Sequence, residues 1–156
     1  MADLQLVVFR LGAEQFAAPI ARVKEILRPV KATRMPRSAI FLKGLFNLRG
    51  QVLALMDTQA RLGLFAEMSA ANTESKNPKN RVMVVEARGE TIGMMVDEVV
   101  EVLRCDEAVL QKPSNVLDLP GGRFLASVAD VDGRLVLVLD LDMMVRGLAG
   151  AEALAI

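Results

Sequence analysis

The sequence contains no histidine, tryptophan or tyrosine, and it has a single cysteine, Cys105. Without histidine the chain cannot carry a phosphohistidine relay, a Ser-His-Asp triad or a histidine-ligated metal. One cysteine excludes an intramolecular disulfide and suits a reducing compartment, so we interpret Cys105 as a packing residue. Glycine loops of the Walker or G-x-G-x-x-G type, which cradle phosphates, are also missing. These absences predict a protein that is not an enzyme and holds no cofactor or metal.

Long apolar runs are also missing, although 53% of the residues are hydrophobic. No run approaches the ~18 residues that a membrane-spanning helix needs. The first residues, M-A-D-L-Q, lack the basic and apolar regions of a signal peptide. A length of 156 residues suits one domain, or two small lobes that share a core. We therefore predict a cytoplasmic, free-standing protein that folds as one domain over residues 1–156 and has no direct membrane insertion.

Charge is divided unevenly along the chain, although 19 Lys and Arg balance 19 Asp and Glu overall. Residues 1–62 hold ten basic and four acidic residues, a net +6, and residues 63–156 hold nine and fifteen, a net −6. Basic residues concentrate between Arg22 and Arg49, where Glu25 is the only acid. The division either reflects two solvated surfaces or suits head-to-tail contacts with partners of matching polarity.

Four segments have the pattern of β-hairpins, in which two apolar runs flank a short turn that contains glycine. The paired strands are expected at residues 4–11 with 15–18, 45–48 with 52–56, 82–86 with 91–96, and 125–131 with 134–139. Because apolar residues occupy both faces of these strands, both faces should be buried. Short helices are expected near residues 58–62 and from 141 to 148, and loops over 67–80 and 106–122.

The hairpins form an internal repeat. An offset of 76 aligns residues 8–27 with 84–103, and an offset of 83 aligns residues 41–57 with 124–140. Because the matches keep the same order of turns and strands, we predict two similar small β-barrels, each made of a hairpin, a connecting segment and a second hairpin. The connecting segment 20–27 has spacing that also allows a helix, but the β-branched residues of its counterpart favour a bend followed by a strand.

Several motifs together resemble the CheW family, the coupling proteins of bacterial chemosensory arrays. The motifs are F-A-A-P-I-A-R-V-K-E-I-L (16–27), M-P-R-S-A-I-F-L-K-G-L-F-N-L-R-G (35–50), L-A-L-M-D (53–57) and I-G-M-M-V-D-E-V-V-E-V-L (92–103). The resemblance runs from about residue 6 to residue 148. The combination of V-x-E-I, K-G-x-x-N-x-R-G and V-D-x-V-x-x-V-L is specific, whereas any one of them alone is weak.

The resemblance implies a mostly β fold of two intertwined SH3-like five-stranded barrels with short helices and a C-terminal helix. We place one subdomain at roughly 15–80 and the other at roughly 81–140, with the N-terminal strand and C-terminal helix packing between the lobes. The implied function is a non-enzymatic adaptor that links the cytoplasmic tips of methyl-accepting chemoreceptors to the regulatory domain of a CheA-type histidine kinase.

In the family, the two lobes contact different kinase lobes, and the groove between them takes the receptor's helical hairpin. Ring contacts between copies of the adaptor are also implied, and heterologous contacts of this kind suit the uneven charge. The motif variants in this chain leave flagellar chemotaxis and a pilus or other motility pathway equally open.

The family's functional positions fall on six residues of this chain. They are Val23, Glu25, Gly44, Asn47, Arg49 and Val102. Arg49 is the most informative of them, because the same turn position in the second repeat holds Asp132. Turn geometry favours Asp or Asn before a glycine, so it accounts for Gly50 and leaves the arginine unexplained.

The other positions keep a structural interpretation beside the functional one. Glu25 either pairs with a cation on the receptor or kinase, or is solvated like its counterpart Glu101. Val23 either contacts a partner or belongs to the core. Gly44 either permits a close approach of two backbones or marks a β-bulge.

A small barrel that binds nucleic acid through the basic region 22–49 is the alternative function. Such proteins stack bases on aromatic side chains, and Phe41 and Phe46 are the only aromatic residues in this region. We therefore expect protein partners and no nucleic acid.

Overall fold

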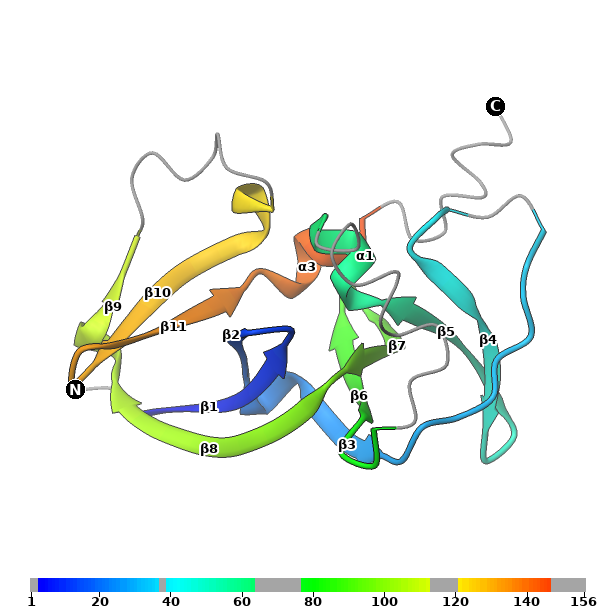
Figure 1. The fold of residues 1–156 in the computed structure, drawn as a ribbon, viewed down its shortest axis with the longest axis horizontal. Coiled ribbons are helices and arrows are strands. Elements are labelled where there is room, and N and C mark those ends of the chain that lie inside the picture. The colour runs from blue at the N-terminus through cyan, green and yellow to red at the C-terminus, as the bar shows by residue number, and fades with distance from the viewer. Residues whose placement is uncertain (1–2, 37–38, 64–76, 113–120, 147–156) are drawn as a thin grey trace.

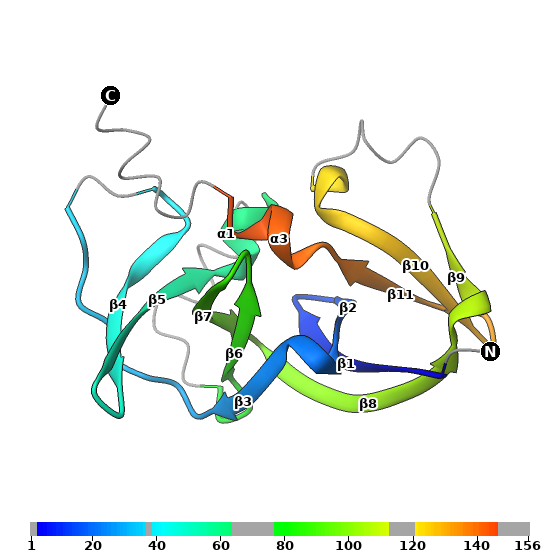
Figure 2. The same cartoon turned by 180° about the vertical axis from the view of Figure 1, so that it is seen from behind.

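A computed structural model describes residues 3–36, 39–63, 77–112 and 121–146. Two β-sheets lie side by side, and the short helices α1 (Thr58–Leu62) and α3 (Leu141–Met144) lie together between them (Figures 1 and 2). Lobe A contains, in spatial order, β8 (Glu98–Asp106), β1 (Asp3–Leu11), β2 (Glu14–Pro19), β11 (Arg134–Leu139), β10 (Leu125–Val131) and β9 (Leu110–Gln111). Lobe B contains β3 (Val23–Leu27), β6 (Arg81–Ala87), β7 (Glu90–Val96), β5 (Gln51–Asp57) and β4 (Leu42–Leu48).

The two lobes exchange hairpins. The β1–β2 hairpin pairs with β8 and, in parallel, with β11, both from the second repeat. The β6–β7 hairpin pairs with β3 and, in parallel, with β5, both from the first repeat. The predicted intertwined two-barrel fold is therefore confirmed, but a repeat does not form its own barrel as the sequence suggested. Repeats show which segments are alike, whereas long-range pairing decides where each hairpin lies.

The four predicted hairpins are confirmed, and so is the bend before β3, a 3-10 turn at Ile20–Arg22. Helix α1 (Thr58–Leu62) also lies where it was predicted, and Asp57 caps it by accepting a hydrogen bond from the Ala60 amide.

Two predicted segments need correction. Helix α3 (Leu141–Met144) is shorter than the expected 141–148; residues 145–146 form a hydrogen-bonded turn, and 147–148 lie outside the described residues. The expected loop 106–122 begins with a 3-10 turn (Glu107–Val109) and β9, and 113–120 are not described. Both corrections depend on tertiary contacts. The Arg61 side chain donates hydrogen bonds to the carbonyls at the end of α3. Pairing with β10 makes the segment after the 3-10 turn a strand, β9. Of the expected loop 67–80, only residues 77–80 are described.

Three apolar clusters explain why the strands are apolar on both faces. Along β1, Leu6 and Val8 point into the barrel of lobe A, whereas Val7 and Phe9 point into a core shared by both lobes. A third cluster around Phe46 fills the barrel of lobe B. Each central strand thus separates a barrel interior from the shared core.

Polar contacts fix the tips of the exchanged hairpins to the opposite lobe. At the β1–β2 turn, Gly12 donates its amide to Asp97 (2.7 Å), and Asp97 also accepts from the amide nitrogen of Gln59 on α1 (2.9 Å). At the β6–β7 turn, Arg88 donates its amide to Asp142 on α3 (2.9 Å). The two donors, Gly12 and Arg88, occupy matching positions of the repeat, whereas the accepting aspartates do not: Asp97 follows β7 and Asp142 lies on α3. A backbone amide at the turn bonded to an aspartate thus holds both hairpins.

The Asp142 anchor makes part of the stability depend on pH. Hydrogen bonds from the Arg22 side chain and the Arg88 amide hold the pKa of the Asp142 carboxyl below its ordinary value of 3.8. A carboxyl with a lowered folded-state pKa contributes stability above its unfolded-state pKa, and this contribution is lost as the pH falls through the folded-state pKa. We expect Asp142→Asn to unfold at a lower temperature than the wild type at neutral pH, with a difference that shrinks as the pH falls below about 4, the ordinary pKa of an aspartate. Thermal unfolding followed by circular dichroism tests this, and a difference that stays constant below that pH would contradict it.

Candidate partner-binding site

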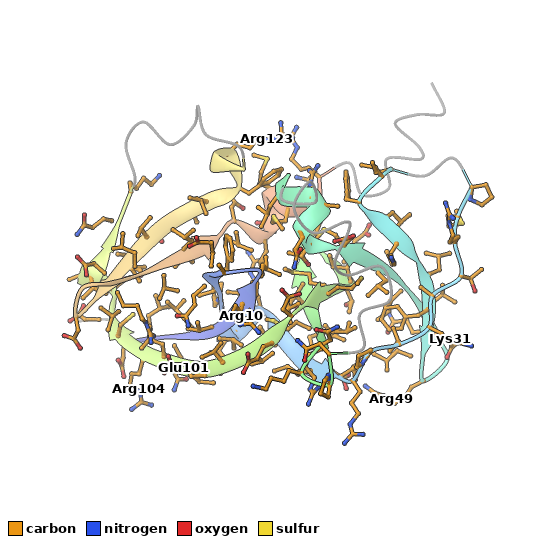
Figure 3. All side chains as sticks on the ribbon, in the orientation of Figure 1. Arg10, Lys31, Arg49, Glu101, Arg104 and Arg123 are labelled. Atoms are coloured by element: carbon orange, nitrogen blue, oxygen red, sulfur yellow. The ribbon has the colours of Figure 1, made fainter. Side chains whose placement is uncertain are left out.

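Four of the six predicted site residues gather around the β4–β5 hairpin of lobe B. Gly44 and Asn47 lie on β4, Arg49 lies in the turn, and Glu25 faces the turn from β3. Arg49 Nη2 donates a hydrogen bond to Glu25 Oε2, so the two residues form an ion pair. The Arg49 side chain still remains 68% exposed. Figure 3 shows it pointing away from the body of lobe B, which leaves most of the guanidinium available to a partner.

Arg49 occupies a backbone conformation that suits other residues better. Its φ is 51° and that of Gly50 is 88°, the positive pair of a type I′ turn, for which Asn-Gly and Asp-Gly are favoured. At a positive φ, an L-residue other than Asn or Asp destabilises the fold by about 1 kcal/mol. An exposed ion pair stabilises the fold by only about 0–1 kcal/mol. Stability therefore does not explain the arginine.

Asn47 shapes the same turn. Its Oδ1 accepts a hydrogen bond from the Gly50 amide (3.0 Å). In the second repeat, Asp130 accepts from the Gly133 amide in the same way (3.2 Å). The matching bond in both lobes indicates that Asn47 positions the hairpin that carries Arg49.

Lobe A has an ion pair that corresponds to Glu25–Arg49. Glu101 accepts a hydrogen bond from Arg134 Nη2 at 2.7 Å (Figure 3 labels Glu101 on β8). Glu25 and Glu101 are therefore both paired and not merely solvated. The arginines come from different positions, because Arg134 follows its turn whereas Arg49 lies within one. Arg134 does not stand out in the sequence motifs, although a basic residue beside the repeated turn is a usable signal.

Gly44 satisfies both of its sequence interpretations. A Cβ built on Gly44 would lie 2.4 Å from the Thr33 carbonyl oxygen. Thr33 lies alongside β4 there and forms an antiparallel bridge with Leu45 through two backbone hydrogen bonds, each 2.8 Å long. A bulge also interrupts the β4–β5 register between Leu42 and Gly44. The glycine therefore lets the chain after β3 close the barrel of lobe B.

Val23 and Val102 belong to a different region from Arg49. Val23 is half-buried against the core shared by the lobes. Val102 pairs with Val7 of that core but is itself 52% exposed on edge strand β8. Ile26 on edge strand β3 pairs with the core residue Met83 in the same way and is also exposed. Because directly paired residues share a face, the apolar layer between the lobes reaches the surface at both edge strands.

The remaining chemically distinctive groups have structural surroundings. Cys105 is half-buried against the barrel of lobe A, and burial, followed by the nearby Asp106 and Asp3, raises the pKa of its thiol. Within the four described ranges, no three His, Cys, Asp or Glu side chains gather as metal ligands. In the same ranges, every helix is too short or too polar to cross a bilayer.

Comparison with known proteins agrees with this architecture over nearly the whole chain. The chain is 30% identical to a chemotaxis protein CheW of Rhizobium meliloti over 138 residues, 88% of this chain and 84% of that one. It is 36% identical to the protein PilI of Pseudomonas aeruginosa over 91 residues, 58% of this chain and 47% of that one. Among solved structures, the scaffolding protein TtCheW of Thermoanaerobacter tengcongensis superposes with a TM-score of 0.80 at 27% identity, covering 92% of this chain and 88% of that one.

The family profile described as the CheW-like domain matches residues 5–149. That match spans both repeats, both exchanged hairpins and α3. The chain therefore belongs to the CheW-like domain family.

Proposed function

We propose that this chain is a non-enzymatic, cytoplasmic adaptor that couples the tips of methyl-accepting chemoreceptors to a CheA-type histidine kinase. The observation that carries the proposal is its likeness, over 92% of its length, to a protein described as a scaffolding protein. Relatives named as chemotaxis proteins and one named PilI support two pathways, flagellar chemotaxis and pilus-based motility.

The proposed docking surface centres on Arg49. Its exposed guanidinium binds a carboxylate of the partner through the N–H groups that Glu25 leaves unused, since arginine carries five donors. Asn47 and Gly44 act as positioning residues, because they fix the turn and the path of β4. The feature of the arginine that supports this role is its exposed ion pair with Glu25, which positions the guanidinium and leaves most of it in solvent.

The apolar layer at the edges of the lobes supplies a second kind of contact. Val102 and Ile26 expose apolar surface that continues the shared core, and Val23 packs beneath that layer. An amphipathic helical hairpin of a receptor buries such surface with its apolar face. We assign this layer to the receptor. The Arg49 surface is assigned to the regulatory domain of the kinase.

The charge division supports contacts between copies of the chain as well. Residues 1–62 carry a net +6 and residues 63–156 a net −6. The basic stretch 22–49 contains β3 and β4, both in lobe B. A basic surface on one lobe favours head-to-tail contacts with an acidic surface of a neighbouring copy, and such contacts form rings when the rotation between neighbours closes. Such ring contacts belong to the proposed function.

Co-sedimentation tests the coupling function. Receptor signalling fragments are assembled on vesicles and mixed with a CheA-type kinase and the wild-type chain, using several candidate receptor and kinase pairs. We expect the chain and the kinase to sediment together with the receptor and the kinase activity to rise. Mixtures without receptor or without the chain are the controls. Failure to co-assemble with every pair would contradict the proposal.

A further inference from the structure

We infer that lobe B carries a further docking site, which binds an acidic amphipathic segment of a protein partner where the chain enters β4. A hollow of about 420 Å³ is present there. It is lined chiefly by Arg34, Met35, Ala39, Ile40, Leu42 and Lys43. This hollow lies at the start of β4, whereas Arg49 follows the end of the same strand. The two surfaces are therefore distinct.

The apolar part of the hollow faces solvent. Ile40 is 76% exposed, more than any other large hydrophobic residue in the described part of the chain, and Met35 is 39% exposed. None of the seven lining residues, which include Pro36, is buried. Aliphatic side chains gathered at an open hollow provide a place for an apolar side chain of a partner to insert.

The charged part of the hollow has one sign. Arg34 and Lys43 have no ion-pair partner among the described residues, in contrast to Arg22 and Arg49 of the same region. The sequence has no acidic residue between Arg28 and Arg49 that would neutralise them. Charge complementarity therefore selects a partner with carboxylates on both sides of its inserted apolar residue.

The shape and composition favour a protein segment over other anions. Small-molecule sites enclose their ligands, whereas every lining residue here is exposed or half-buried. Single-stranded nucleic acid needs aromatic rings for stacking. The neighbouring ring of Phe41 is already occupied, because the Arg61 guanidinium lies 4.2 Å from its centroid. Aliphatic residues flanked by cations match an acidic amphipathic helix. This inference does not depend on the proposed coupling function.

Fluorescence anisotropy with the full chain tests the site. The probes are two labelled synthetic helices with leucine at i, i+3, i+4 and i+7 spacing, one carrying glutamate beside the leucines and the other carrying lysine. We expect saturable binding of the glutamate helix and binding of the lysine helix that is at least about tenfold weaker. Lys43→Glu and Ile40→Ser should each weaken the glutamate helix at least about fivefold with an unchanged unfolding temperature. Lys112→Glu, which changes an exposed lysine in lobe A, is the matched control and should bind as the wild type does.

Several outcomes would overturn the inference. The first is no binding of the glutamate helix, and the second is equal binding of both helices. The third is wild-type affinity of Ile40→Ser for the glutamate helix, which would indicate non-specific electrostatic attraction. Displacement of the bound helix by a single-stranded oligonucleotide at lower concentration than by unlabelled helix would assign the hollow to nucleic acid instead.

Discussion

Replacing Gly44 with alanine is expected to destabilise the protein by about 3 kcal/mol, at the upper end of what overpacking costs. The new methyl group would lie 2.4 Å from the Thr33 oxygen and 2.8 Å from the Thr33 carbonyl carbon. Backbone atoms cannot move aside as a flexible side chain does, so the bridge between Thr33 and Leu45 must open. The two hydrogen bonds between Thr33 and Leu45 would then be lost. Chemical denaturation measures the change in the free energy of unfolding.

Gly50→Ala is the matched control for this experiment. Gly50 also has a positive φ, 88°, but a Cβ there would meet nothing within 4 Å. Its replacement should therefore cost only the left-handed strain, about 1 kcal/mol. Equal costs at the two positions would contradict the close-approach explanation of Gly44.

Replacing Arg61 with methionine is expected to cost about 3 kcal/mol, because several charged contacts disappear together. Arg61 on α1 donates to the carbonyls of Met144 (2.8 Å), Met143 (3.2 Å) and Arg146 (2.6 Å) at the end of α3. Its guanidinium also lies 4.2 Å and 4.6 Å from the ring centroids of Phe41 and Phe124. Burial, together with repulsion from Arg123, lowers the pKa of Arg61, but an arginine in a protein stays charged.

The Arg61 contacts join the two lobes, since α1 follows β5 and α3 follows β11. Methionine keeps the apolar stem but leaves the carbonyls of α3 without their donor. For a chain of this size, the unfolding temperature should fall by about 10 °C. Differential scanning calorimetry provides the measurement.

Arg123→Met is the matched control for Arg61. Arg123 also stacks on Phe124, at 4.8 Å, and Figure 3 shows it at the outer edge of the molecule. A cation–π contact at an exposed site is worth about 0.5–1 kcal/mol. A comparable loss of stability in both variants would show that the carbonyl contacts contribute little.

The local part of this fold follows from the sequence, and the long-range part does not. Turn pairs such as Arg88-Gly89 and Asp132-Gly133 fix hairpins through neighbouring residues, so all four hairpins and α1 were predictable. Repeats located the corresponding segments but did not reveal that the hairpins are exchanged. That exchange depends on burial of β1 and β6 against strands many residues away.

In the candidate site as well, the sequence identifies single residues but not the long-range contacts between them. Family motifs identified Glu25 and Arg49, but the ion pair between them joins strands at opposite edges of lobe B and has no local signature. Gly44 stood out as a bulge or a close approach, and only the position of Thr33 shows that both occur. Arg61 has no distinctive motif, because its partners are backbone carbonyls and rings from three other segments.

The most direct test of the account compares two arginines in identical turn positions. Arg49 and Arg88 both have a φ of 51° and both precede glycine. Asparagine suits this position better than arginine, so neither Arg49→Asn nor Arg88→Asn should lower the unfolding temperature. Only Arg49 forms an ion pair with β3 and lies in the proposed docking surface.

The measurement is co-assembly of each variant with the receptor fragments and the CheA-type kinase. We expect Arg49→Asn to bind at least about tenfold more weakly, because the interface loses an arginine at its centre. Arg88→Asn should bind and support kinase activity like the wild type. Wild-type co-assembly of Arg49→Asn would contradict the claim that this hairpin presents its arginine to a partner.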